Sequence, residues 1–336
     1  MSADEFSIPV LANIRSEAEA YLLMEGLRWD GTPVCPHCGT IGRAYYLTPR
    51  DGVSRSTRAP RKDGTQTRSE RRVWKCGACR KQFSVLTGTI FHGSKIPLRT
   101  WLFVIFEMCA SKNGVSAREI ERKYGTTSKT AWFMLHRIRE AMKREPLAGL
   151  LSGTVVADET WIGGTPSNRH ASKRKPSRAP QSWNHVATDK TAVVALVNRE
   201  SGEVRSEVVP NVRGASLRKV IEENVDMGST VLNTDSHLAY RPIGADMPGH
   251  GMVNHQAGEY VRDGITTNEA EGYFSQLKRS IDGTHHHVSV EHLPRYLAEF
   301  DYRYTTNKVT DSQRMADLMG RTAGRRLTYR PLTTGE

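Results

Sequence analysis

Three acidic residues occupy positions from which they could bind divalent metal ions together. Asp158 and Asp235 each close a short β-branched and apolar run, and Glu271 lies on one face of an amphipathic helix predicted over residues 266–282. Seventy-six residues separate the two aspartates, and thirty-five separate Asp235 from Glu271. Three converging carboxylates suit Mg²⁺ or Mn²⁺, and a pair of such ions supports in-line displacement at a phosphodiester. Lys278, two turns after Glu271 on the same stripe, would then suit a phosphate.

Taken singly, these residues have structural explanations. An aspartate at a strand end is more often a turn residue, and an acidic helix face is more often simply solvated. Their joint spacing favours the metal site. Glu159 follows Asp158 directly, and because successive side chains of a strand point to opposite faces, we expect it to face away from the metal ligands.

Four of the five cysteines form two CxxC pairs, which predict a structural zinc site. The pairs are Cys35 with Cys38 and Cys76 with Cys79. Four thiolates satisfy tetrahedral Zn²⁺, whereas two independent redox or structural pairs are the alternative. Thirty-seven residues separate the pairs, so the predicted ribbon carries an insertion, and its basic composition suits either phosphate contacts or a solvated loop. Cys109 lies in an apolar helix and is predicted to be a core residue.

The bulk composition describes a soluble globular protein with a polyanionic partner. The chain has 336 residues, 38% of them hydrophobic, which allows two or three domains with a sizeable core. Its formal net charge of +12 indicates nucleic acid as the partner. The longest apolar run, residues 101–110, is too short to cross a bilayer, and the first residues lack a secretory pattern. We therefore expect a cytoplasmic protein without membrane contact.

A helical block follows the predicted ribbon and has the order of a helix-turn-helix. Helices are predicted over residues 97–111, 116–124 and 127–143, the second opened by an S-x-x-E capping box, with Gly125 in the turn before the third. The N-terminal end of the third helix, which would enter a major groove, carries Ser128, Lys129 and Thr130. Arg137 is a candidate phosphate contact. Plain packing of a helical bundle is the alternative.

The rest of the chain has an α/β pattern. Strands are predicted over residues 155–162, 192–198, 204–209, 230–235 and 250–255, with helices over 215–225 and 290–304. Three strands, a helix and a fourth strand match a ribonuclease-H-like mixed sheet, in which acids at strand ends meet an acid on a later helix. A basic loop that includes Arg174 and Lys175 would contact the DNA backbone, unless it is a disordered connection.

These elements predict four regions. They are an N-terminal helix and zinc ribbon (1–92), a helix-turn-helix domain (97–145), a catalytic domain (150–310) and a basic tail (311–336).

Assembled, these motifs resemble the DDE transposases of bacterial insertion sequences, in the group that joins a zinc ribbon to an ISXO-type catalytic domain. The resemblance rests on WKCGACRKQFSVLTGTIF, ADETWIGG, NTDSHLAY, TTNEAEGYFSQLKR and GTHHHVSVEHL. It implies that Asp158, Asp235 and Glu271 bind the catalytic Mg²⁺ or Mn²⁺, with Lys278 and Arg279 on the DNA. Some members use Asn as the third ligand, so Asn268 competes with Glu271 or assists it.

The resemblance implies metal-dependent cleavage at transposon ends and strand transfer into target DNA. The partners would be double-stranded DNA, as terminal repeats and as target, and a second copy of the chain, since synapsis of two ends needs at least a dimer. Two alternatives remain. A catalytically inactive DNA-binding regulator would keep the scaffold, and a ribonuclease-H-like nuclease or resolvase would keep the acids without needing two DNA-reading modules.

Overall fold

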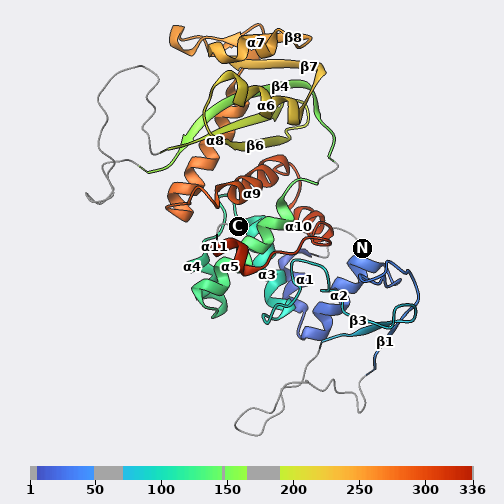
Figure 1. Cartoon of the computed structure of the whole chain (residues 1–336). Coiled ribbons are helices and arrows are strands. Elements are labelled where there is room, and N and C mark those ends of the chain that lie inside the picture. Colours follow the sequence, from blue (N-terminus) through green and yellow to red (C-terminus); the bar gives the residue numbers. More distant parts are fainter. Residues whose placement is uncertain (1–5, 49–70, 146–147, 165–189, 335–336) are drawn as a thin grey trace.

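The computed structural model describes residues 6–48, 71–145, 148–164 and 190–334. Two bodies pack against each other: a helical and ribbon body built mainly from the N-terminal half, and an α/β body built from the C-terminal half (Figure 1). Most of the basic insertion, and Arg174 and Lys175 with their loop, lie outside the described residues. Within the described ranges, no helix combines the length and the apolar character that crossing a membrane requires.

The ribbon is a small antiparallel sheet packed on a helix. Its strands are β1 (Ala44–Tyr46), β2 (Trp74–Cys76) and β3 (Gln82–Phe83), in the order β1-β2-β3, and it follows α1 (Ile8–Asn13) and α2 (Glu17–Trp29). The Trp29 ring at the end of α2 lies 5.8 Å from the rings of both Trp74 and Phe83. Glu25 accepts a hydrogen bond from the Trp74 indole at 2.8 Å. Aromatic packing therefore holds α2 on the ribbon.

The helical block forms as its capping signals predict. It consists of α3 (Leu98–Ala110), α4 (Ala117–Tyr124) and α5 (Ser128–Met142). The Ser116 hydroxyl accepts from the Glu119 backbone N–H and the Thr127 hydroxyl accepts from the Thr130 backbone N–H, each at 3.2 Å. Gly125, at φ 61°, makes the left-handed turn between α4 and α5. This order fits a helix-turn-helix, and its reading of DNA stays a prediction.

The α/β body contains the predicted mixed sheet, consistent with a ribonuclease-H-like core. Its strands are β4 (Leu151–Ile162), β5 (Thr191–Asn198), β6 (Val204–Val209), β7 (Val225–Asp235) and β8 (Gly249–Val253). The strand order is β6-β5-β4-β7-β8; β4, β5 and β6 are antiparallel, and β4, β7 and β8 are parallel. The helix α6 (Gly214–Asn224) connects β6 to β7, as the pattern predicts.

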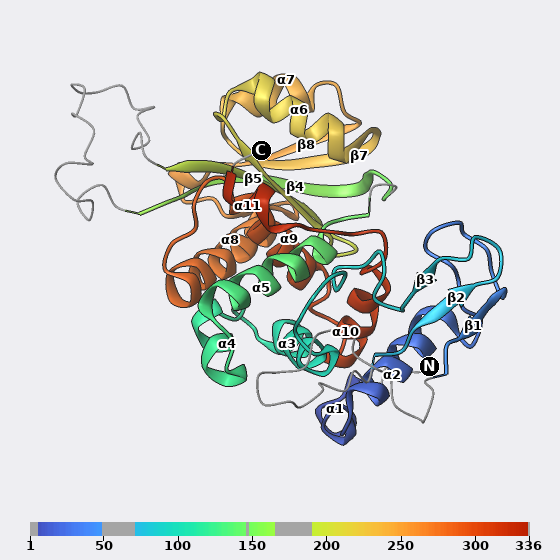
Figure 2. The same cartoon turned by 60° about the horizontal axis from the view of Figure 1, so that its bottom comes forward.

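Helices cover both faces of this sheet (Figure 2). One face packs against α6, the turn η5 (Leu238–Tyr240) and α7 (Arg241–Gly244). The other packs against α8 (Asn268–Ser280), the π-helical turn η7 (Ile281–His285) and α9 (Leu293–Thr305). Between β8 and α8 lie the turn η6 (His255–Ala257) and a hairpin of β9 (Val261–Arg262) and β10 (Ile265–Thr266).

The region predicted as a basic tail instead contains two helices, α10 (Asp311–Gly320) and α11 (Tyr329–Thr334). Thr310 and Gln313 close a capping box at the start of α10. Met315, Leu318 and Met319 are buried in the same core as the ribbon and α3 to α5. Their i, i+3, i+4 spacing forms an apolar stripe, so α10 completes the N-terminal core although it follows the catalytic domain in sequence.

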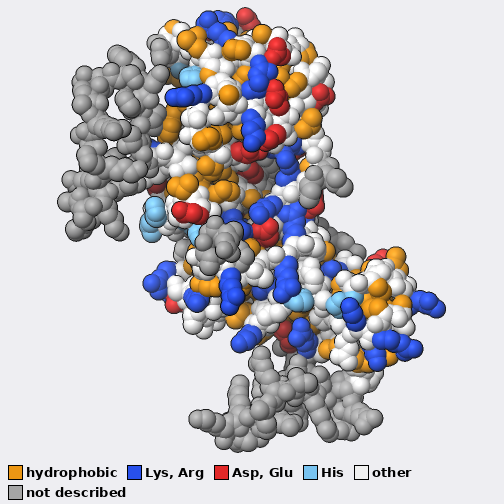
Figure 3. Space-filling view, in the orientation of Figure 1, with side chains coloured by type: hydrophobic (Ala, Val, Ile, Leu, Met, Phe, Trp, Pro, Cys, Tyr) orange, Lys and Arg blue, Asp and Glu red, His pale blue; other side chains and the backbone are white. Residues whose placement is uncertain are grey.

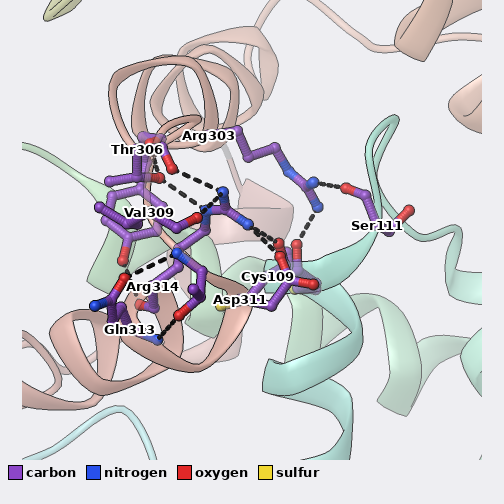
Figure 4. Close-up of polar contacts among 11 residues, drawn as sticks. Cys109, Ser111, Arg303, Thr306, Val309, Asp311, Gln313 and Arg314 are labelled. Atoms are coloured by element: carbon purple, nitrogen blue, oxygen red, sulfur yellow. Dashed lines mark hydrogen bonds and ion pairs between the residues drawn. The ribbon is translucent and has the colours of Figure 1, made fainter. Parts of the chain in front are cut away.

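Two arginines from the C-terminal part of the chain bind the end of α3. Arg303 of α9 donates to the Ser111 and Met108 carbonyls, and Arg314 of α10 donates to the Cys109 carbonyl at 2.6 Å (Figure 4). These carbonyls end α3, where no further helical N–H is available to them. Cys109 is buried, as predicted.

Candidate metal and nucleic-acid sites

The four CxxC thiols form a cluster that fits a zinc ion. The sulfurs of Cys35 and Cys79, and those of Cys38 and Cys76, lie 3.7 Å apart, and all four lie within 4.8 Å of one another. Tetrahedral zinc with Zn–S bonds of about 2.3 Å needs sulfur separations of about 3.8 Å. Antiparallel pairing of Ala44 with Cys76 joins the two segments that carry the CxxC pairs, so the long insertion does not disrupt the site.

Asp158 and Asp235 lie on one face of the sheet because of the register of β4 and β7. Val156 of β4 pairs with Asn233 of the parallel strand β7, and each aspartate follows two residues later. Side chains two apart on a strand share a face. Val156 is buried in the cluster that contains α8, so both carboxylates point toward the helix that carries Glu271. Asp158 stands within β4, four residues before its end, and Asp235 ends β7.

Glu271 lies in the first turn of α8, at the edge of this face. Its Oε1 is 3.4 Å from the Thr267 hydroxyl and 3.4 Å from Nε2 of His255, and its side chain is 46% exposed. Among the described residues, only the four cysteines form a group of three or more candidate ligands whose donor atoms all lie within 4.8 Å. The three carboxylates therefore face a common region without closing into a compact cluster.

The electrostatics around Asp158 suit a cation. Burial, reinforced by the charges of Glu159, Asp235 and Glu271, raises the pKa of this carboxyl to about 7, against a hydrogen bond from the Glu159 N–H that lowers it. A divalent ion at this position would offset both the burial and the repulsion. Glu159 faces the opposite side of the sheet, as predicted, where it accepts a 2.7 Å hydrogen bond from Tyr240.

The remaining candidates on α8 are exposed. Asn268 begins the helix, and its backbone N–H donates to the Thr266 hydroxyl at 3.1 Å. Lys278 and Arg279 are exposed in the last turn, the latter donating to the Ser275 carbonyl.

The start of α5 presents part of the surface that the helix-turn-helix prediction requires. Lys129 is exposed, with its ammonium 4.5 Å from the centre of the Tyr329 ring, while Ser128 and Thr130 are partly buried.

The prediction that Arg137 contacts a DNA phosphate is corrected by the structure. The Arg137 side chain is only 4% exposed and donates to the His92 carbonyl at 2.7 Å. Packing against the body thus removes this guanidinium from any DNA-facing surface. Lys and Arg side chains spread over the helical and ribbon body on the face seen in Figure 3.

Two family models match the chain in the order that its architecture suggests. The transposase zinc-ribbon domain matches residues 15–82, and the ISXO2-like transposase domain matches residues 150–305. Residues 150–305 thus form an ISXO2-like transposase domain, and residues 15–82 a transposase zinc-ribbon domain. The second match spans the mixed sheet together with α8 and α9, and the first contains all four zinc-site cysteines.

A curated relative of this chain is named for a mobile element. It is an uncharacterized protein in transposable element ISH50 of Halobacterium salinarum, 25% identical over 292 residues, which are 86% of this chain and 90% of the relative. Among solved structures, a chain from the simian T-cell lymphotropic virus intasome in complex with PP2A regulatory subunit B56 gamma is 12% identical, with a TM-score of 0.27. That match covers 59% of this chain and 65% of the other, and so low a score carries no argument.

The sequence pattern does not mark His255 as a neighbour of the candidate metal ligands. It places this residue at the end of a strand, whereas in the structure its Nε2 lies 2.8 Å from the Thr267 hydroxyl and 3.4 Å from Glu271. One signal was available. His255 follows the strand that pairs with the strand of Asp235, so it emerges at the same sheet edge as the aspartates.

Proposed function

We propose that this protein cleaves DNA at transposon ends and transfers the cleaved strand into target DNA, with Asp158, Asp235 and Glu271 as metal ligands. The observation that carries the proposal is the register of β4 and β7, which places two aspartates on the sheet face covered by the glutamate-bearing helix. Bound Mg²⁺ or Mn²⁺ would supply Lewis-acid activation of the attacking oxygen and charge stabilisation of the leaving oxygen.

The chain's own residues position DNA for two phosphoryl transfers. Hydrolysis at the element's end breaks one phosphodiester bond and frees a 3′-hydroxyl. That hydroxyl attacks a target phosphodiester, forming one phosphate ester bond as another breaks. Lys278 and Arg279 lie at the opposite end of α8 from Glu271, so we assign them to the phosphates flanking the reacting one.

DNA recognition is assigned to the N-terminal body. Ser128, Lys129 and Thr130 would contact the terminal repeat, and the zinc ribbon would hold adjacent backbone. Synapsis of two ends requires at least two copies of the chain. We place the reaction in the cytoplasm, at the nucleoid.

The test is strand cleavage of a labelled oligonucleotide that carries the element's own end, in Mg²⁺ or Mn²⁺. Native protein should cut it, and Asp158→Asn, Asp235→Asn and Glu271→Gln should bind the DNA without cutting. If Glu271→Gln still cuts while Asn268→Ala does not, Asn268 is the third ligand. Native protein that binds the end but never cuts it would favour the alternative function, a DNA-binding regulator.

A further inference from the structure

His255 occupies a position from which it can control the third acid. It follows β8, in which Val253 pairs with Asp235, and it emerges two residues later in η6. Its Nε2 lies 2.8 Å from the Thr267 hydroxyl oxygen and 3.4 Å from Glu271 Oε1. The strand beside Asp235 is thereby connected to the first turn of the glutamate-bearing helix.

We infer that His255 is a positioning residue, which orients the Glu271 carboxylate for metal binding together with Asp158 and Asp235. This inference rests on the proposed function. A glutamate side chain loses considerable rotamer freedom when it is fixed. The Glu271 side chain is 46% exposed, so the surrounding protein packs against only part of it. A partner that holds the carboxylate in place reduces the entropy cost of ordering this side chain when the metal binds.

Both neighbours of His255 are suited to this role. Thr267 has no exposed surface, and its hydroxyl lies within 3.4 Å of the same Glu271 oxygen, so it contacts the imidazole and the carboxylate together. The Tyr260 ring lies 5.2 Å from the imidazole and packs against it. Partners on both sides of the β9–β10 hairpin therefore restrict the ring that faces Glu271.

The test compares His255→Phe with His255→Gln in the full-length, zinc-loaded protein. Phenylalanine keeps a ring and removes the polar contact, whereas the glutamine amide can restore a donor near the position of Nε2. The direct readout is Mn²⁺ binding, followed by the paramagnetic resonance signal of free Mn²⁺. We expect His255→Phe to weaken Mn²⁺ binding by about 10–100-fold and His255→Gln to stay close to native.

A second readout separates positioning from damage to the fold. Cleavage of the element-end oligonucleotide by His255→Phe should need more Mn²⁺ but recover most of its native rate at saturation. Zinc content and circular dichroism should remain native. His287→Phe, at an exposed histidine beyond α8, is the matched control and should bind Mn²⁺ as the native protein does.

Two results would overturn the role of His255. One is native Mn²⁺ affinity in His255→Phe, and the other is equal impairment in His255→Gln, which would mean that the imidazole itself is required. Failure of the proposed function looks different. Asp158→Asn and Glu271→Gln would then bind Mn²⁺ as tightly as the native protein, which would exclude the metal site and with it this role for His255.

Discussion

Glu299 of α9 is a carboxylate with no exposed surface, held between arginines that come from both bodies. Arg139 of α5 donates to it at 2.7 Å and Arg303 at 3.1 Å. Burial favours the neutral form, but the two guanidinium charges prevail and lower the pKa of Glu299 to about 2. Arg139 also stacks 3.8 Å from the centre of the Tyr296 ring. The sequence pattern did not predict this network, because periodicity marks apolar stripes and does not reveal a distant acid.

Replacing Glu299 by Gln should destabilise the protein by about 3–5 kcal/mol, because two buried guanidinium groups lose their counter-charge. Urea unfolding at neutral pH measures the change. The control is Glu222→Gln, which removes an exposed ion pair with Arg218 and should cost less than about 0.5 kcal/mol. Equal effects of the two substitutions would contradict the importance of this buried network.

His136 of α5 should make the stability depend on pH. Its ring has no exposed surface, and its two nitrogens have no hydrogen-bond partner among the described residues. Burial, reinforced by the charge of Arg139, lowers its pKa to about 2. The unfolded chain therefore binds a proton below about pH 6.5 that the folded chain does not, so stability falls as the pH drops through that value.

The measurement is the free energy of unfolding of the native protein and of His136→Phe at pH 7.5 and pH 5.5. The native protein should lose about 1.4 kcal/mol more than the variant between these conditions. Acid effects on the zinc thiolates are common to both proteins and cancel in the comparison. An equal loss in both would show that His136 is protonated without cost in the folded state.

At the scale of elements, helices and strands were predicted where the sequence marks them with capping residues or with a regular apolar pattern. Hydroxyl caps and the glycine turn marked α4 and α5, and β-branched runs marked the sheet strands, with β4 and β7 beginning earlier than predicted. The α10 helix was missed, although Thr310 and Gln313 carry its capping box. Its apolar stripe consists of only three residues, which is too short for periodicity alone to mark a helix. Which core that stripe enters depends on α3, about 200 residues earlier, and no local pattern reports such a contact.

The zinc site allows a prediction about the ribbon. Native protein should contain one zinc per chain, and Cys76→Ser should lose it, because three thiolates bind the ion much more weakly. The tryptophan fluorescence of Trp29 and Trp74, which pack together beside the site, should then shift to the red. Cys109→Ser is the control and should keep its zinc, as Cys109 lies in the core of α3. Unchanged zinc content in Cys76→Ser would contradict the four-cysteine site.

At the scale of the whole molecule, the net charge of +12 predicts DNA binding that weakens steeply with salt. If Lys278 and Arg279 contact phosphates, replacing both by Ala should reduce the slope of log Kd against log salt by about 1–2. The control replaces Arg218 and Lys219 of α6, on the opposite face of the sheet. The proposed DNA path along α8 would be wrong if both double variants changed the slope equally.

In the proposed function, the acids on β4, β7 and α8 join a transposon end to target DNA. The most direct measurement supplies a pre-cleaved element end with a free 3′-hydroxyl, a supercoiled plasmid and Mg²⁺, and follows the covalent joining of one to the other. Native protein should produce the joined product. Asp158→Asn should not produce it, nor should native protein given an end that lacks the 3′-hydroxyl. Plasmid nicking without joining by the native protein would contradict strand transfer and identify a nuclease instead.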